Sequence, residues 1–111
     1  MYIKHSGALL ERMADTGVDI VSLDWTVDMA EGRARLDAAQ EKAGRVKRTN
    51  VQGNLDPALL FADHDTIRER TKEIIEKAGP GHIMNLGHGI EAATPEENAK
   101  AFVDFVREYR Y

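Results

Sequence analysis

Residues 83–90, Ile-Met-Asn-Leu-Gly-His-Gly-Ile, carry the side chain with the clearest chemical potential in this sequence. The stretch begins apolar, as a buried parallel strand does, and then breaks into a histidine between two glycines. In α/β proteins, ligands and catalytic groups gather at the carboxyl ends of strands. The two flanking glycines allow close backbone approach and unusual φ values, so His88 can point into a cleft. The alternative is a strand-terminal histidine that only hydrogen-bonds its own loop.

Three further polar residues follow expected strands and could line the wall of the same site: Ser6, Asp24 and Asn54. Ser6 also fits ordinary turn chemistry, as does its neighbour His5. Asp24 stands beside Trp25, the only tryptophan, and could instead N-cap the following helix. We expect Trp25 to have a structural role, covering the end of the strands.

Apolar stretches and turn signals alternate along the chain in a regular order. Strands are expected at residues 1–3 (the tail of one), 18–23, 50–53 and 83–86, and helices at 8–16, 27–43, 58–62, 63–78 and 94–109. Alternating strands and helices of this length imply a parallel sheet with right-handed crossovers. A complete (β/α)8 barrel needs roughly 250 residues. The 111-residue chain therefore has the pattern of half of one, with four βα units in a single domain over residues 1–111.

Capping residues set the expected helix boundaries. Asp56 with Pro57, and then Asp63, should begin helices, whereas Gly17, Gly44 and Gly79 should end them. The helix at 63–78 should bury a face made of Ile67, Thr71, Ile74, Ile75 and Ala78. The last helix should begin with a capping box made of Thr94, Pro95 and Glu97. Its inward face should consist of Ala99, Phe102, Val103 and Val106.

The composition restricts the partners of the chain. Lys+Arg 15 against Asp+Glu 19 give a net charge of −4 with no basic cluster, which disfavours nucleic acid. Without cysteine, the chain holds no disulfide and no thiolate metal site, and we expect no bound metal. No apolar run approaches the roughly 20 residues of a membrane span, so no membrane partner is expected. No signal or transit peptide is visible, and residues 41–48 should form a charged, solvated excursion.

Four blocks of sequence, taken in order, resemble the uroporphyrinogen decarboxylase family. They are Leu-Leu-Glu-Arg at 9–12, Val-Ser-Leu-Asp-Trp-Thr-Val-Asp-Met-Ala at 21–30, Val-Gln-Gly-Asn-Leu-Asp-Pro at 51–57 and Asn-Leu-Gly-His-Gly-Ile at 85–90. The resemblance covers nearly the whole chain, and it is specific because all four motifs match in order and near the family's spacing. The block around Asp24 and the Arg110-Tyr111 ending are most similar to plant and algal plastid forms.

The resemblance implies the carboxy-terminal portion of a single-domain (β/α)8 barrel that is usually a homodimer. It implies an enzyme that removes CO2 from the four acetate side chains of uroporphyrinogen, giving coproporphyrinogen without metal or organic cofactor. Of the family's substrate-contacting residues, only a histidine carries over, onto His88; no catalytic residue does. The substrate bears eight carboxylates, and an imidazole can donate a hydrogen bond in either charge state. A plastid location is implied, with the cytoplasm as the alternative.

Other parts of the family pattern are missing. The Arg-Gln-Ala-Gly-Arg loop, the aspartate that holds the pyrrole N–H groups, a tyrosine and a serine have no counterpart in this chain. Lys4-His5 stands where the plant pattern has Asn-Gly, and residues 37–48 form a longer segment than usual. Met1 falls inside a strand of the family pattern, which leads us to expect an incomplete or mis-started chain without activity of its own.

Two other interpretations compete with this one. The chain could be a non-catalytic interaction module that pairs with the full-length enzyme, and co-purification with that enzyme would distinguish it. The chain could also belong to the related corrinoid methyltransferase barrels. Those barrels bind zinc partly through cysteine thiolates, so the absence of cysteine argues against this interpretation.

Overall fold

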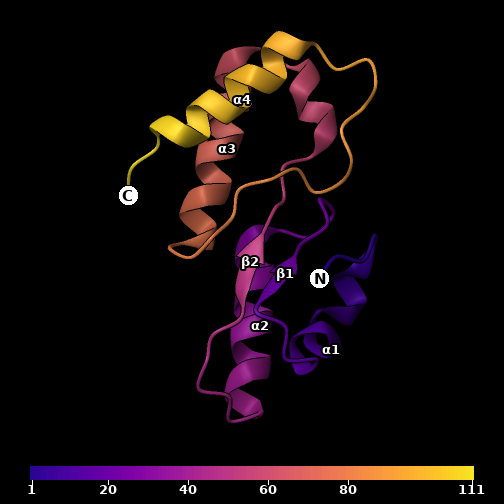
Figure 1. The fold of residues 1–111 in the computed structure, drawn as a ribbon, viewed down its shortest axis with the longest axis vertical. Coiled ribbons are helices and arrows are strands. Elements are labelled where there is room, and N and C mark those ends of the chain that lie inside the picture. Colours follow the sequence, from indigo (N-terminus) through magenta and orange to yellow (C-terminus); the bar gives the residue numbers. More distant parts are fainter.

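The structure, a computed structural model that describes residues 1–111, combines a small parallel sheet with helices (Figure 1). The elements in order are η1 (Ser6–Leu9), α1 (Leu10–Asp15), β1 (Ile20–Ser22), α2 (Met29–Lys42), β2 (Asn50–Gln52), η2 (Pro57–Phe61), α3 (His64–Ala78) and α4 (Glu96–Glu108), where η marks a 3-10 helix. The molecule is elongated, with extents of 44 × 29 × 18 Å. The α/β class expected from the sequence is confirmed.

The sheet consists of parallel segments arranged in chain order. β1 and β2 pair with Val21 opposite Val51. Tyr2 joins β1 through a single bridge to Ser22, and Ile83 joins β2 through a single bridge to Gln52. The order is therefore residues 1–3, β1, β2 and residues 83–86, all running in one direction, so their carboxyl ends lie at one edge of the sheet.

Only two of the four expected strands form a continuous ladder. Residues 83–86 touch β2 and the chain beyond it through two isolated bridges, Gln52 with Ile83 and Leu55 with Leu86. Between these bridges the backbone turns at Gly53, whose φ is 116°. A Cβ atom there would lie 2.8 Å from the carbonyl oxygen of Leu23, so the close approach of β1 and β2 requires glycine. This turn interrupts the pairing of the last segment.

Most helix boundaries follow the expected capping residues. Asp63 accepts from the N–H of Thr66 at 2.7 Å and begins α3, and Asp56 caps η2, which has Pro57 in its first turn. The cap of α2 is Asp28, whose carboxylate accepts from Glu31 N–H, so Asp24 does not cap this helix. Three glycines expected to end helices have positive φ: Gly17, Gly44 and Gly79.

The start and the buried face of α4 differ from expectation. Its N-cap is Pro95, without a side-chain cap, and the hydroxyl of Thr94 is buried without a partner, so the capping box is wrong. Thr94 N–H instead donates to the carbonyl of Glu91, placing Thr94 in the preceding turn. Val103 is 42% exposed, whereas Asn98 is buried. Asn98 lies on the buried face, where its amide donates to the carbonyls of Leu60 and Ala62.

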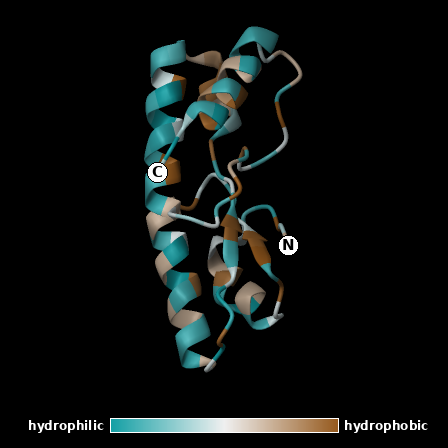
Figure 2. Ribbon diagram, turned by 60° about the vertical axis from the view of Figure 1, so that its left-hand side comes forward, coloured by the Kyte–Doolittle hydropathy of each residue, from teal (hydrophilic) through white to brown (hydrophobic).

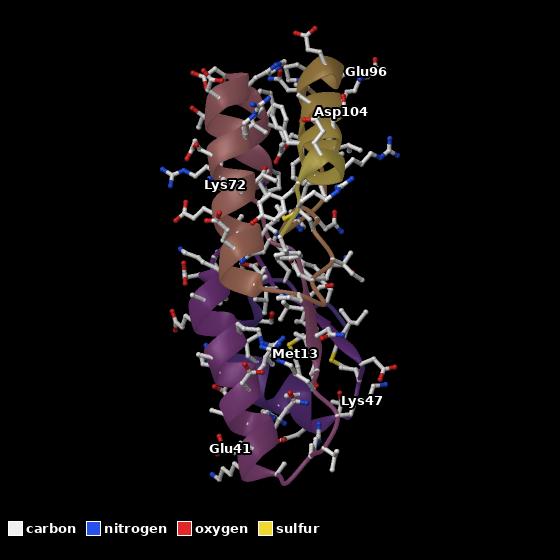
Figure 3. All side chains as sticks on the ribbon, turned by 90° about the vertical axis from the view of Figure 1, so that its left-hand side faces the viewer. Met13, Glu41, Lys47, Lys72, Glu96 and Asp104 are labelled. Carbon is white, nitrogen blue, oxygen red and sulfur yellow. The ribbon has the colours of Figure 1, made fainter.

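Two apolar clusters make up the core. The first lies between the sheet, α1 and α2 and includes Leu10, Met13, Val21, Leu36 and Val51. The second lies between η2, α3 and α4 and consists of Leu55, Leu60, Ile67 and Phe102. Hydrophobic residues follow the strands, and hydrophilic ones dominate the outer sides of the helices (Figure 2). Figure 3 shows α3 and α4 side by side above α2, with Met13 among the elements of the lower half.

The charged segment at residues 41–48 is largely exposed, as expected, and a few hydrogen bonds attach it to the rest of the protein. Gln40 is buried and donates to the carbonyl of Lys47 at 2.7 Å and the hydroxyl of Thr49 at 2.9 Å. The Arg45 guanidinium bonds the carbonyls of Ala14 and Asp15 at the end of α1. A cation suits a helix carboxyl terminus because it neutralises the unpaired carbonyls there. None of residues 41–48 is buried, so the prediction of a solvated segment outside the core is confirmed, with these contacts attaching it to α1 and α2.

Candidate functional site

The polar residues expected to form a site do meet at the carboxyl edge of the sheet. His5 and Ser6 follow residues 1–3, Asp24 follows β1, Asn54 follows β2, and His88 follows residues 83–86. The structure divides them into two layers. Ser6, Asp24 and Asn54 are buried, with 0%, 0% and 4% exposure, whereas His88 and His5 are exposed.

Asp24 is the centre of the buried layer. One carboxylate oxygen accepts from the N–H of His5 at 2.9 Å, and the other accepts from the N–H and the hydroxyl of Thr26 at 2.7 and 2.5 Å. Burial alone would raise the pKa of Asp24, but these hydrogen bonds outweigh it and lower the pKa below its ordinary value. Asp24 is therefore an ionised carboxylate that ties the first loop to the second.

Asn54 braces the same loop from the other side. Its amide donates to the carbonyl of Asp24 at 2.9 Å and to that of Val27 at 2.5 Å. Buried carbonyls need such partners, since an unpaired one costs the full desolvation penalty. The hydroxyl of Ser6 has no partner in this structure. The place of these three residues in a substrate-binding wall stays a prediction; the observed contacts of Asp24 and Asn54 support the exposed layer above them.

The exposed layer is a row of rings. The centroid of the His88 ring lies 5.2 Å from that of Trp25 and 6.5 Å from that of Tyr2. The His5 ring lies 5.5 Å from Trp25, measured in the same way. The hydroxyl of Tyr2 donates to the carbonyl of Gly87 at 3.0 Å and lies 3.2 Å from Nδ1 of His88. Trp25 is thus the spacer between two imidazoles.

Gly87 is what lets the histidine loop reach this row. A Cβ atom on Gly87 would overlap the backbone of Trp25, at 2.7 Å from its Cα. Because real Cβ atoms do not approach that closely, only glycine permits the contact. The expectation that a glycine beside His88 serves close backbone approach is confirmed at this position, whereas the expected unusual φ is wrong, since neither Gly87 nor Gly89 has a positive φ. Gly89, in contrast, has open space around it.

A hollow of about 420 Å³ opens beside His88 on the face of the sheet opposite the helices. Val21 and Val51 point into the core, whereas Ser22 and Gln52 are half-buried and point into this hollow. The residues that line it are Tyr2, Ser22, Gln52, Asn85, Leu86, His88, Gly89 and Ile90. They include no carboxylate, so the hollow suits a ligand with apolar surface and acidic groups near the histidine.

Two residues of this site, Tyr2 and His5, were not expected from the sequence as binding groups. Tyr2 reaches the site only because residues 1–3 pair with β1. His5 carries one local signal, its place in a turn beside a serine, and its contact with Trp25 depends on tertiary packing. No group of three His, Asp or Glu side chains is arranged to hold a metal ion. None of the helices combines the length and apolar character needed to cross a bilayer.

Comparison with known proteins identifies the family of this chain. The family model described as "Uroporphyrinogen decarboxylase (URO-D)" matches residues 1–109. The chain belongs to the uroporphyrinogen decarboxylase family. It is 53% identical over 108 residues to uroporphyrinogen decarboxylase of Gloeobacter violaceus, covering 96% of this chain and 28% of the relative.

Plant members of the uroporphyrinogen decarboxylase family are nearly as similar. The chain is 51% identical over 112 aligned residues to "Uroporphyrinogen decarboxylase 2, chloroplastic" of Arabidopsis thaliana, covering 100% of this chain and 26% of the relative. A chloroplastic relative from Zea mays is 50% identical over the same length. The resemblance to plant forms is confirmed, and the chain spans less than a third of the length of these relatives.

Proposed function

We propose that residues 1–111 form the carboxy-terminal βα units of a (β/α)8 barrel that decarboxylates uroporphyrinogen. The observation that carries the proposal is the arrangement of the parallel sheet, together with membership in the uroporphyrinogen decarboxylase family. Its four segments run parallel in chain order, with His88 at their carboxyl edge. Active sites of (β/α)8 barrels lie at that edge. The open face of the sheet would then be the inside of the barrel.

The reaction removes four acetate carboxylates as CO2 and gives coproporphyrinogen. Each step needs a proton delivered to the departing position and a positive charge stabilised on the ring. In this chain, His88 binds a carboxylate of the substrate, because its ring is exposed beside a hollow without acidic side chains. A charge-assisted hydrogen bond of this kind is about twice as strong as a neutral one. His88 thus orients the substrate rather than carrying the essential proton.

Asp24 and Asn54 support the wall of this site from below, and Ser6 lies buried beside them. The ionised carboxylate of Asp24 holds the loops of His5 and Thr26 together, and it is fully buried, so it does not repel an anionic substrate at contact distance. The proposal needs neither metal nor organic cofactor. It includes a homodimeric enzyme and a plastid location, and the similarity to the chloroplastic plant relatives supports the location.

A chimera tests this proposal directly. The matched segment of the Gloeobacter violaceus relative would be replaced by residues 1–111, giving a protein that we call the barrel chimera. We expect it to convert uroporphyrinogen to coproporphyrinogen, measured by chromatography of the oxidised porphyrins. The 111-residue chain alone should give no product above background, because its hollow is open on one side.

The unaltered relative is the control for assay and folding. A barrel chimera that folds and binds uroporphyrin, yet makes no coproporphyrinogen, would contradict the proposal. That outcome, combined with co-purification of the 111-residue chain and the intact relative, would favour the alternative of a non-catalytic interaction module.

A further inference from the structure

His5 is held in a backbone conformation that a histidine rarely adopts. Its φ is 55° and its ψ is 39°, and it is the only residue other than glycine with positive φ in the chain. This left-handed conformation costs energy for any side chain with a Cβ atom. Residues kept in such conformations concentrate at binding and catalytic sites, where the surrounding structure fixes them.

The buried layer of the site fixes His5 in place. The N–H of His5 donates to Asp24 at 2.9 Å, and Asp24 is itself held by Thr26 and fully buried. If the N–H of His5 turned toward water, the buried carboxylate oxygen of Asp24 would lose its donor, which is unfavourable. The fold therefore maintains the conformation of His5 through a charged, desolvated partner.

The imidazole of His5 is free to bind a ligand. Its ring is exposed and makes no hydrogen bond within the protein, and its only ring contact is with Trp25 at 5.5 Å. His88 lies 5.2 Å from the same indole. The two imidazoles are thus separated by one tryptophan, and both lie at the carboxyl edge of the sheet. Lys4, next to His5, is also exposed and adds positive charge to this edge.

We propose that His5 binds a second carboxylate of the ligand whose first carboxylate is bound by His88, with Trp25 setting the distance between the two imidazoles. The ligand is an organic polycarboxylate with acidic groups on neighbouring arms. This inference rests on the proposed function for the identity of that ligand, a carboxylated tetrapyrrole. His5 is a binding and specificity residue, and it takes no part in bond breaking.

The test is the His5→Gly variant of the barrel chimera. Glycine adopts the left-handed conformation without strain, so the melting temperature should stay the same or rise. Uroporphyrin is a fluorescent octacarboxylate that is not turned over. Its binding should weaken by about three- to tenfold, less than a buried charge-assisted contact would give, because the ring of His5 is exposed. KM for uroporphyrinogen should rise by a similar factor while kcat changes little.

Two further variants make the result specific. His5→Asn also tolerates the left-handed region and should weaken binding as His5→Gly does. Lys4→Gln removes a neighbouring positive charge and should weaken binding much less. Unchanged uroporphyrin affinity in His5→Gly, or an equal loss in Lys4→Gln, would overturn the inference. Uroporphyrin binding can be measured without turnover. If the barrel chimera is inactive but its His5→Gly variant binds uroporphyrin more weakly, only the proposed function is contradicted.

Discussion

The hydroxyl of Tyr2 lies 3.2 Å from Nδ1 of His88, joining two residues 86 positions apart in the chain. The same hydroxyl donates to the carbonyl of Gly87, so it accepts from Nδ1–H of His88. A hydroxyl has one proton to donate and two lone pairs that accept. This bond leaves Nε2 as the ring nitrogen that faces a ligand, and in the protonated ring Nε2–H can donate to a carboxylate.

Tyr2→Phe in the barrel chimera should therefore loosen His88 without removing it. We expect KM for uroporphyrinogen to rise by about two- to tenfold, as loss of one neutral hydrogen bond predicts. The distribution of His88 between its two neutral tautomers should also shift away from Nδ1–H, which nitrogen chemical shifts of labelled histidine would report. Unchanged tautomer signals in a folded Tyr2→Phe protein would show that the hydroxyl does not orient the ring.

His88→Asn removes the imidazole that we propose binds a substrate carboxylate. A charge-assisted hydrogen bond is worth about 1.5–3 kcal/mol, and about 1.4 kcal/mol corresponds to a factor of ten in rate. Decarboxylation by the barrel chimera should thus slow by roughly ten- to a hundredfold. Partly decarboxylated intermediates should accumulate, because a loosely held substrate leaves before all acetates react. A loss of four or more decades with substrate binding intact would assign chemistry, rather than orientation, to His88.

Asp24→Asn tests the buried layer. Asparagine keeps an oxygen for Thr26 but turns an NH2 group toward the N–H of His5, so two donors face each other. We expect the free energy of unfolding to fall by about 2–3 kcal/mol, measured by denaturant titration of the barrel chimera. Asp28→Asn is the matched control, because asparagine caps a helix as well as aspartate does. Equal losses in the two variants would contradict a special role for Asp24.

The same carboxylate gives stability a pH dependence. The pKa of Asp24 is lowered in the folded protein, so its contribution is fully present above the ordinary aspartate pKa. That contribution is lost as the pH falls through the lowered, folded-state pKa. Between pH 6 and acid pH, the parent protein should therefore lose more stability than Asp24→Asn, which has no group to titrate there. Parallel curves for the two proteins would count against an ionised Asp24.

The open face of the sheet predicts the behaviour of the 111-residue chain alone. Met1, Tyr2, Ile3, Ile83 and Ile90 are each at least 41% exposed and belong to the outer segments of the sheet or the loop after them. Exposed apolar surface beside unpaired strand edges binds other chains. We expect the chain to self-associate or to bind a hydrophobic dye, and the barrel chimera to do neither. A sharply melting monomer in sedimentation, without dye binding, would contradict this expectation.

The sequence by itself determined the features that depend on near neighbours. The start of α3 at Asp63, the end of α3 at Gly79 and the buried face with Ile67 and Ile75 follow from contacts within a few residues. The position of His88 in a loop after an apolar stretch was likewise visible, because a glycine pair marks the break. The family resemblance, carried by four short motifs in order, was also readable without a structure and is confirmed.

Tertiary structure alone decided how distant residues meet. The buried face of α4 is set by Asn98, whose amide bonds carbonyls of η2 and the following residue, and no helical pattern contains that information. Asp24 looked equally suited to a cap or a site wall; the structure shows that it does not cap α2 and that its carboxylate accepts from the N–H of His5. The row of Tyr2, Trp25 and His88 exists because parallel pairing brings three strand ends to one edge. Pairing register is a long-range property, so residues far apart in sequence acquire a shared function only when the sheet forms.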